Sequence, residues 1–403
     1  MVTMPDVDAM RRAEPPFDAG RLDRLMEEAG LDLVLASSRH NLRWLLGGYQ
    51  FLFFSAMEAI GHSRYLPIVI YARGRPEDAG YVAHGMERYD HATRPFWTPG
   101  FLPVARGTRD AAAAAAGHVE RIGGARARIG IEPGFLPADA WRVLTERLPD
   151  ARLADATGVF ERARALKTPE ELGKLRLASE LITDSMLATI AGLGAGLGAG
   201  VGEGATKYAI IERLRREETS RGLGFDYCLI TAGTSLNRGP SDQIWERGDI
   251  LSLDSGGNWQ GWIGDLCRMG IRGEPDAELE DLLAEVDAAQ QAAFGAVRAG
   301  AAGGAVIERG EAARRAGPNA ACTDFVAHGM GLVSHEVPFL MKHPVGYDGV
   351  DAERPLEAGM VLSVETTMEH PRRGFIKLED TVAVTAEGYE IFGDRGRGWN
   401  RAG

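Results

Sequence analysis

Two segments in the C-terminal half of the chain set acidic residues inside apolar runs, and they constrain the fold more than any other feature. The first carries Asp254 and Asp265 on either side of a glycine-rich turn centred near Trp259. The second carries Glu365 and Glu379 on either side of a turn that contains proline and glycine. Each pattern predicts an antiparallel hairpin in which the two acids face each other across the ladder.

Carboxylates that oppose each other in an apolar sheet repel and are costly to bury. A bound dication removes that cost, and oxygen ligands suit Mn, Fe, Co or Zn. The alternative for one hairpin is a solvated strand face with accidental acids. Two such hairpins in one domain, together with a histidine between them, favour a metal centre.

That histidine is His328, which follows a strand-like run and precedes Gly329 and Gly331, residues that permit close approach of other groups. A lone histidine in an apolar run is more often a hydrogen-bonded core residue. His335 begins a His-Glu sequence that is reminiscent of the zinc motif HExxH. Phe339 stands where the second histidine of that motif would be, so we do not assign it.

The chain has 403 residues, which exceeds what one hydrophobic core usually supports. We predict an N-terminal arm, an α/β domain and an α+β domain, over residues 1–16, 17–162 and 163–403. The α/β domain is indicated by alternating strands and helices, with strands expected near residues 31–35, 65–71, 79–82 and 127–131 and helices near 18–28, 109–122 and 138–148.

Thr168 and Pro169 form a helix-start signal for the second domain, with threonine as the cap and proline at the first helical position. We expect helices near residues 169–190, 204–220, 277–298 and 304–316. The glycine-rich stretch from Gly192 to Gly200 fits a dinucleotide-binding pattern loosely. It follows a helix and not a strand, so we interpret it as a loop.

Charge and composition exclude several classes of partner. The chain has 45 basic and 57 acidic residues, a net charge of −12, whereas nucleic-acid binding needs clustered basic residues. The longest apolar stretch, residues 45–57, is too short to span a bilayer. The first residues contain no secretory signal pattern, and the three cysteines form no disulfide framework, so we expect a cytoplasmic protein.

The acidic hairpins and the histidine together resemble the pita-bread metallohydrolases, which include methionine aminopeptidase, aminopeptidase P, prolidase and the metal-free creatinase. The resemblance covers residues 165–395, and the N-terminal part is similar in size to that of the prolidase–creatinase branch. The matching residues, in chain order, are Asp254, Asp265, His328-Gly329-Met330-Gly331, Glu365 and Lys377-Leu378-Glu379-Asp380.

The resemblance implies two divalent metal ions, most typically manganese, with Fe, Co or Zn as alternatives. Asp254 would bind one metal, Asp265 and Glu379 would bridge both, and His328 and Glu365 would bind the other. A hydroxide between the metals would be the nucleophile.

Within the same resemblance Glu365 would also shuttle a proton. His335 would stabilise the tetrahedral intermediate, as in the prolidase and aminopeptidase P branch.

One position departs from the family pattern. Where a further catalytic histidine is expected, this chain has Asn237, which can donate a hydrogen bond but cannot deliver a proton. Asn237 is therefore a candidate catalytic position that puts ordinary peptidase activity in question. Arg238 beside it is a candidate for binding an anionic substrate, with a surface arginine as the alternative.

Creatinase-like relatives are homodimers in which the N-terminal domain of one subunit reaches the partner's site. That resemblance makes Arg64 the candidate for holding a substrate carboxylate in trans, with His62 beside it. Phe51 to Phe54, just upstream, is either a wall of that pocket or plain core.

The leading hypothesis is hydrolysis of a C–N bond in a small carboxylated substrate, such as an Xaa-Pro dipeptide. A second is a non-peptidase enzyme on the same fold, such as an ectoine-type hydrolase or a dimethylsulfoniopropionate lyase. The lyase branch carries an extra aspartate where this chain has Gly256, which counts against it. A third is a non-catalytic binding protein, which the complete ligand set disfavours.

Overall fold

The computed structural model describes residues 14–59, 61–193, 204–343 and 347–402. The chain divides into two compact units between Arg164 and Ala165, whereas the sequence places the boundary between residues 162 and 163. Most of the expected N-terminal arm, and the glycine-rich stretch after Leu193, lie outside the described residues. Among the described residues, helices long and apolar enough to cross a membrane are absent.

The N-terminal unit is built on a six-stranded mixed sheet in the order β4-β3-β2-β1-β5-β6. Strand β1 pairs antiparallel with β2 and parallel with β5, and β1 and β2 are buried along their whole length. Asp18 caps the first helix by accepting a hydrogen bond from Arg21 N at 2.8 Å, as its sequence position predicts.

The elements of this unit, in chain order, are α1 (Ala19–Glu28), β1 (Leu33–Ala36), α2 (Arg39–Leu45), α3 (Leu52–Ala56), β2 (Ile68–Ala72), β3 (Arg75–His84), α4 (Glu87–Thr93), β4 (Gly100–Ala105), α5 (Thr108–Arg121), β5 (Arg128–Ile131), α6 (Ala138–Arg147), β6 (Arg152–Asp155) and α7 (Thr157–Ala165).

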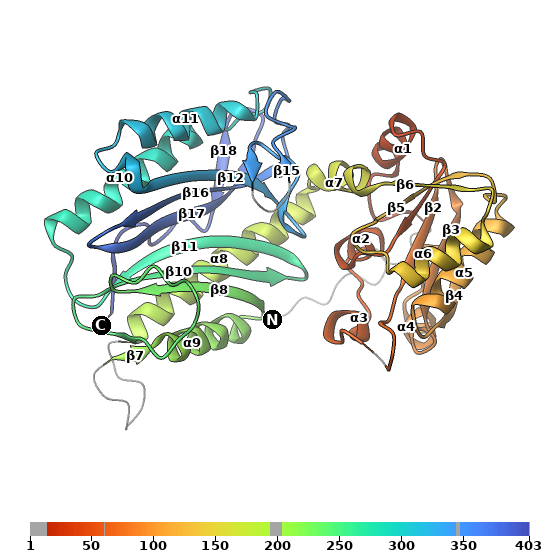
Figure 1. Cartoon of the computed structure of the whole chain (residues 1–403), viewed down its shortest axis with the longest axis horizontal. Coiled ribbons are helices and arrows are strands. Elements are labelled where there is room, and N and C mark those ends of the chain that lie inside the picture. Colours follow the sequence, from red (N-terminus) through yellow and green to blue (C-terminus); the bar gives the residue numbers. More distant parts are fainter. Residues whose placement is uncertain (1–13, 60, 194–203, 344–346, 403) are drawn as a thin grey trace. The chain divides into compact units, whose positions relative to one another are not determined.

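The C-terminal unit is built on a larger sheet in the order β13-β12-β16-β17-β11-β10-β8. Helices α8 and α9 pack on β8, β10 and β11, whereas α10 and α11 pack on β12, β16 and β17 (Figure 1). The unit therefore has two halves, each with a pair of helices and one long hairpin. Thr168 and Glu171 form a reciprocal capping box at the start of α8, with hydrogen bonds of 3.3 and 2.8 Å.

The elements of this unit are α8 (Pro169–Gly192), β7 (Ala205–Thr206), α9 (Lys207–Ser220), β8 (Gly224–Ala232), β9 (Ile244–Trp245), β10 (Ile250–Trp259), β11 (Trp262–Ile271), α10 (Ala277–Phe294), α11 (Gly304–Ala316), the short 3₁₀ helix η2 (Ala320–Cys322), β12 (Thr323–Met330), β13 (Ser334–Glu336), β14 (Lys342–His343), β15 (Tyr347–Asp348), β16 (Val361–His370), β17 (Gly374–Val384), β18 (Tyr389–Phe392) and β19 (Asn400–Arg401).

The register of the two long hairpins confirms one predicted pair of acids and corrects the other. Glu365 lies directly opposite Glu379. Asp254 lies opposite Cys267, and Asp265 opposite Gly256, so the aspartates are diagonal neighbours and the prediction that they face each other was wrong.

The reason is the position of the turn in the first hairpin. Its turn is the two-residue loop Gln260-Gly261, in which both residues have positive φ (54° and 89°). That loop lies one position beyond the turn centre expected from the glycines, and the shift moves the pairing by two residues.

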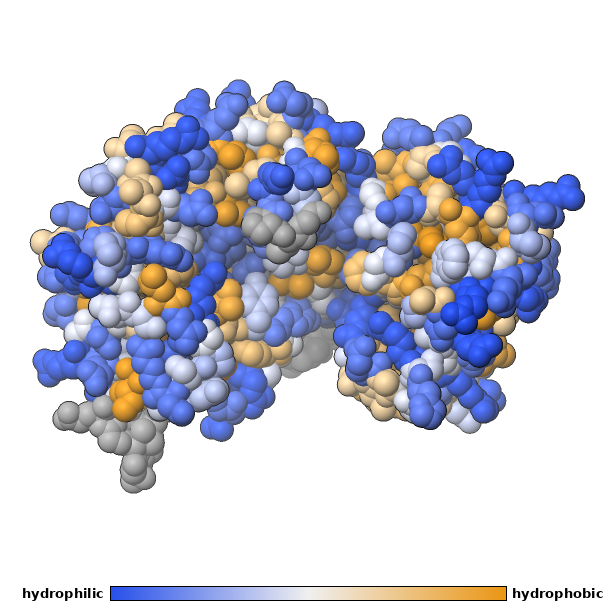
Figure 2. Space-filling view, in the orientation of Figure 1, coloured by the Kyte–Doolittle hydropathy of each residue, from blue (hydrophilic) through white to orange (hydrophobic). Residues whose placement is uncertain are grey.

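Seen in the space-filling view of Figure 2, hydrophilic residues cover much of both units and apolar residues form scattered patches among them. Such a surface is ordinary for a water-facing protein and singles out no site by itself.

Candidate metal centre

All the predicted metal ligands lie on one face of the C-terminal sheet, and the register explains why. Residues that pair directly share a face, and so do residues two apart along a strand. The pairing of Asp254 with Cys267, of Cys267 with Glu379 and of Glu379 with Glu365 therefore builds one polar row across four strands. His328 joins that face because β12 pairs with β16.

Three of these side chains come together as a compact group. Asp265, His328 and Glu379 each offer a ligand atom within 4.8 Å of the others, and all three are buried. Asp265 Oδ1 is buried without a hydrogen-bond partner, while its Oδ2 accepts one from Ser334 Oγ at 3.0 Å. A buried carboxylate oxygen without a donor fits a site whose missing partner is a cation. The residues present therefore suit a divalent metal.

Lys377 contacts three of the four acids, and the sequence analysis gave it no role. Its ammonium lies 2.7 Å from Asp254 Oδ2, 2.5 Å from Glu365 Oε2 and 2.8 Å from Glu379 Oε2. The side chain is almost fully buried. The alternation of β17 could have identified it, because Lys377 stands two residues before Glu379 and so points to the same face.

Burial and charge shift the pKa values of these groups in opposite directions. Burial, reinforced by neighbouring carboxylates, raises the pKa of Asp265 well above its usual range. Burial likewise raises the pKa of Asp254 and Glu365, although Lys377 opposes the rise. For Glu379 burial is outweighed by Lys377 and His328, so its pKa is lowered. A bound dication would favour the ionised form of all four acids.

A second layer of contacts orients the predicted ligands. Ser363 Oγ donates to Glu379 Oε1 at 2.7 Å. Behind β17 the guanidinium of Arg268 pairs with Asp380 at 2.6 Å and donates to the carbonyl of Glu379 at 3.0 Å. Arg268 and Asp380 are both fully buried, so this pair fixes β11 against β17 at the position where the ligands stand.

His335 stands beside the cluster on β13, the short strand at which the chain bends back to pair with β12. Its ring stacks on that of His328, with centroids 3.7 Å apart and an interplanar angle of 11°. Its φ is +63°, a conformation that residues other than glycine adopt rarely. Burial, together with His328 and His343, lowers the pKa of His335 to about 3, so the ring is neutral at neutral pH.

The bend is stabilised by a buried ion pair and by glycines that allow this pair to approach the chain closely. Lys167 Nζ lies 2.8 Å from Glu336 Oε1, and neither side chain is more than 1% exposed. A Cβ at Gly331 would lie 2.0 Å from Glu336 Oε1, so a side chain at that position would displace the pair. The close approach that the glycines next to His328 predicted is therefore present.

Arg238 and Asn237 differ in their relation to the cluster. The guanidinium of Arg238 pairs with Asp254 Oδ2, which places it at the edge of the acidic row. Asn237 is exposed, and its side chain accepts a hydrogen bond from Gly239 N at 2.9 Å within its own turn. The structure brings Arg238 to the ligands but not the side chain of Asn237.

Tyr227 on β8 is a further neighbour that the sequence analysis missed. Burial, and then Asp265, Glu379 and Asp254, raise its pKa well above the usual range, so its phenol stays neutral. A Cβ on Gly256 would lie 2.2 Å from its ring. Gly256 stands where the lyase branch carries an extra aspartate. In the structure the absence of a side chain at this position makes room for the tyrosine.

The predicted substrate-binding residues His62 and Arg64 belong to the N-terminal unit and precede β2. His62 is exposed and Arg64 is partly buried. Phe51 and Phe54 of the adjacent aromatic run are buried, whereas Leu52 is 66% exposed. The run thus contributes mainly to the core of its own domain.

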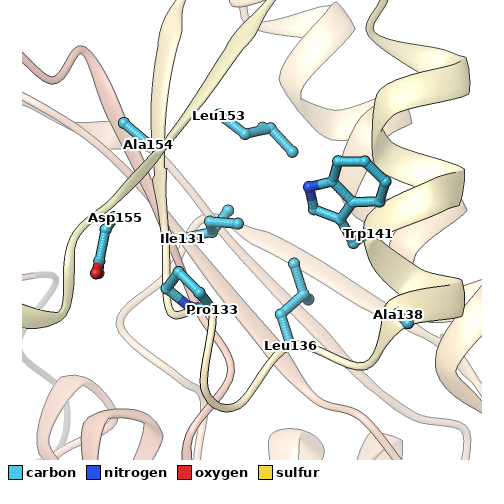
Figure 3. A pocket seen from close by; sticks show the side chains of 8 residues that line it. All are labelled: Ile131, Pro133, Leu136, Ala138, Trp141, Leu153, Ala154 and Asp155. Carbon is cyan, nitrogen blue, oxygen red and sulfur yellow. The ribbon is translucent and has the colours of Figure 1, made fainter.

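The N-terminal unit also contains a hollow of about 430 Å³ at the ends of β5 and β6, beside α6 (Figure 3). Its wall is apolar apart from one carboxylate, and that one, on Asp155, accepts a hydrogen bond from Thr157 N at 2.8 Å. The hollow therefore lacks a group of convergent polar residues; it is lined by Ile131, Pro133, Leu136, Ala138, Trp141, Leu153, Ala154 and Asp155.

Comparisons with known proteins agree with this geometry. Residues 174–386 match the model of metallopeptidase family M24, and residues 19–166 match that of the creatinase/prolidase N-terminal domain. The chain is 25% identical over 269 residues to an uncharacterized peptidase, YqhT, of Bacillus subtilis, covering 65% of this chain and 71% of that protein. It is 29% identical over 237 residues to the Xaa-Pro dipeptidase of Pyrococcus furiosus, covering 57% and 63%.

Among solved structures, an Xaa-Pro dipeptidase from Bacillus anthracis superposes with a TM-score of 0.77 over 98% of this chain and all of that one, at 20% identity. At that identity the likeness shows the fold, which is the predicted combination of a creatinase-like α/β domain and a pita-bread domain. The family model spans more than half of the sequence, including every predicted ligand. The chain belongs to metallopeptidase family M24 and is a prolidase-like hydrolase of the two-domain branch.

Proposed function

We propose that this protein hydrolyses the C–N bond of small carboxylated substrates, with Xaa-Pro dipeptides as the leading class, using two divalent metal ions. The observation that carries the proposal is the buried group of Asp265, His328 and Glu379 with an unpartnered carboxylate oxygen. The similarity to Xaa-Pro dipeptidases supports the choice of substrate class.

Each residue would have a role that follows from its position in the site. Asp254 would hold one metal, His328 and Glu365 the other, and Asp265 and Glu379 would contact both. When bound, the cations would supply a nucleophilic hydroxide at neutral pH and polarise the scissile carbonyl. Glu365, the most exposed of the row at 14%, can carry a proton toward the leaving amine. His335, neutral and adjacent, can donate a hydrogen bond to the carbonyl oxygen as charge develops there.

Manganese is our proposed metal, because the donor set is rich in carboxylates and contains one imidazole. Cytoplasmic localisation is also proposed, and it is supported by the three cysteines, Cys228, Cys267 and Cys322, all of which are free.

The decisive experiment is release of free proline from a panel of Xaa-Pro dipeptides by the manganese-loaded protein. Matched Xaa-Ala dipeptides test whether proline is required, and Asp265→Ala serves as the blank. Turnover of Xaa-Pro alone, absent in the variant, supports the proposal. Protein that holds its metals and turns over none of the dipeptides contradicts the proposed substrate class.

We further propose a homodimer in which Arg64 and His62 bind the substrate carboxylate in the partner's site. Arg64→Ala should then raise KM for dipeptides with little change in kcat. Mixing inactive Asp265→Ala with Arg64→Ala protein tests the shared site, because mixed dimers contain one site with both native residues. At substrate concentrations well below the KM of Arg64→Ala, roughly a quarter of wild-type activity should return at equal mixing. A monomer in sedimentation, or no recovery despite proven subunit exchange, contradicts this proposal.

A further inference from the structure

The side chain of His335 is held from outside the metal centre by Tyr347 on the short strand β15. Tyr347 Oη lies 3.1 Å from His335 Nδ1. The phenol ring stacks on Phe339, with centroids 4.5 Å apart and an interplanar angle of 20°. It also stacks on His343, its cross-strand partner, at 5.4 Å and 16°. These two ring contacts restrict the directions in which the hydroxyl can point.

The chemistry of the two groups decides which of them donates. A neutral imidazole nitrogen is a far stronger base than a phenolic oxygen, so the favoured arrangement is O–H of tyrosine to N of histidine. The phenol is available as a donor, because burial and Glu365 raise the pKa of Tyr347 to about 12. When Nδ1 accepts this bond, the single proton of the neutral ring must reside on Nε2.

We infer that Tyr347 is a positioning residue that fixes His335 as its Nε2–H tautomer, so that this nitrogen is a ready hydrogen-bond donor for a substrate oxygen. The inference rests on the role proposed above for His335. Without the phenol, the ring would divide between two tautomers, and only one of them presents a donor at Nε2. Tyr347 would thus act on catalysis through His335 and not through the substrate.

The hairpin that carries Tyr347 is tied to the same bend. Strand β14 pairs Lys342 with Asp348 and His343 with Tyr347. The ring of His343 lies 4.8 Å from that of His335. Both aromatic residues of this hairpin, His343 and Tyr347, therefore contact His335, and Tyr347 supplies the partner for its Nδ1.

The direct test is the ¹⁵N spectrum of histidine ring nitrogens in zinc-loaded protein, with His335 assigned by comparison with His335→Gln. Protonated and unprotonated ring nitrogens have well-separated shifts. Wild-type protein should show Nδ1 of His335 unprotonated and Nε2 protonated. Tyr347→Phe, which keeps the ring and removes the hydroxyl, should shift both signals toward averaged values. Tyr208→Phe, at a tyrosine that is 54% exposed, should leave them unchanged.

Kinetics provide an independent test. Loss of one hydrogen bond predicts a fall in kcat of about 5- to 10-fold for Tyr347→Phe, with KM within about twofold. His335→Gln should lower kcat by about 100-fold. If Tyr347 acts through His335, adding Tyr347→Phe to His335→Gln should cause no further loss.

Two results would overturn the inference: a protonated Nδ1 in the wild-type spectrum, or losses that multiply in the double variant. The spectrum needs no substrate, so it remains informative if dipeptides prove not to be hydrolysed. In that case the proposed function fails while the tautomer is still measured. A wild-type spectrum as expected with no turnover would support the Tyr347–His335 bond and contradict only its catalytic purpose.

Discussion

The two long hairpins of the C-terminal unit present their acids in different ways. In β16–β17 the glutamates stand directly opposite each other, so their Cβ atoms are about 5 Å apart. In β10–β11 the aspartates are offset by two residues along the ladder, a separation of roughly 7 Å. Asp265 thus reaches the group formed by His328 and Glu379, whereas Asp254 is held by Lys377 and Arg238.

The difference teaches that residue type alone does not decide which acids cluster. A two-residue change in pairing, set by the turn Gln260-Gly261, separates the roles of two aspartates that look alike in the sequence. Substitutions in either hairpin should therefore separate the roles of the two hairpins further or make them equivalent.

The largest effect is expected from Asp265→Asn compared with Asp254→Asn. Asp265 belongs to the compact group and has an oxygen that lacks a donor, so its loss should lower both metal retention and kcat, the latter by at least about 10³-fold. Asp254→Asn should retain more metal, because the compact group is intact. Metal content after desalting, measured by mass spectrometry, checks the order. Equal retention by both variants would remove the distinction between the two aspartates.

Lys377→Met should destabilise the metal-free protein strongly. It removes the ammonium that contacts Asp254, Glu365 and Glu379, leaving buried acids without a counter-charge, at a cost of about 3 kcal/mol in the free energy of unfolding. Urea unfolding in a chelator measures this loss, and excess manganese should recover much of it. Lys342→Met, at an exposed lysine of β14, is the matched control. If the two variants are equally stable without metal, the Lys377 ammonium does not stabilise the packing of the two hairpins against each other.

The stabilisation given by manganese should increase as the pH rises above about 4, the usual pKa of a carboxyl group. In the metal-free chain the raised pKa values of Asp254, Asp265 and Glu365 mean that protons stabilise the folded form. That contribution is complete below about pH 4 and disappears as the pH rises through the folded values. The lowered pKa of Glu379 acts in the opposite sense, with stability present above about pH 4.3 and lost as the pH falls.

Three acids have raised pKa values and only one has a lowered value. The free energy of unfolding of the metal-free protein should therefore fall with rising pH, while that of the metal-loaded protein should not. The gap between the urea midpoints of the two forms is the quantity to measure. A gap that stays constant over this range would mean that the acids do not carry protons in the metal-free fold.

The smallest effect is expected at the turn that sets the register. Gln260 has φ of 54°, which asparagine tolerates better, and Asn-Gly is the preferred sequence for such a two-residue loop. Gln260→Asn should therefore raise the free energy of unfolding by about 1 kcal/mol, without changing activity. Urea unfolding of the metal-loaded protein measures the gain. A loss of stability would contradict the premise that the positive φ of Gln260 strains the loop.

The sequence predicted the fold well where the signals are local or repeated. The cap at Asp18 and the capping box at Thr168 depend on neighbours within three residues, and both are present. The direct pairing of Glu365 with Glu379 followed from the symmetry of the acids about their turn. The same reasoning failed for Asp254 and Asp265 in the first hairpin, because its several glycines allowed more than one turn position.

The site was harder to predict wherever a residue acts by position and not by type. Lys377 looks like an exposed strand residue until the pairing places it between acids from three strands. Tyr227 lies on β8 and Tyr347 on β15, and only the folded chain brings their side chains to Asp265 and His335. Asn237 was selected by its place in a family pattern, while the structure directs its side chain into a local turn.

The buried pair between Lys167 and Glu336 has a consequence for how the protein is made. The partners are 169 residues apart, one at the start of the C-terminal unit and the other beside His335. Contacts between such distant residues form late and slow folding. During synthesis the bend that carries His335 can be fastened only after most of the chain has left the ribosome. The nascent protein should therefore pass through a long stage in which its N-terminal unit is folded and its hydrolytic centre does not yet exist.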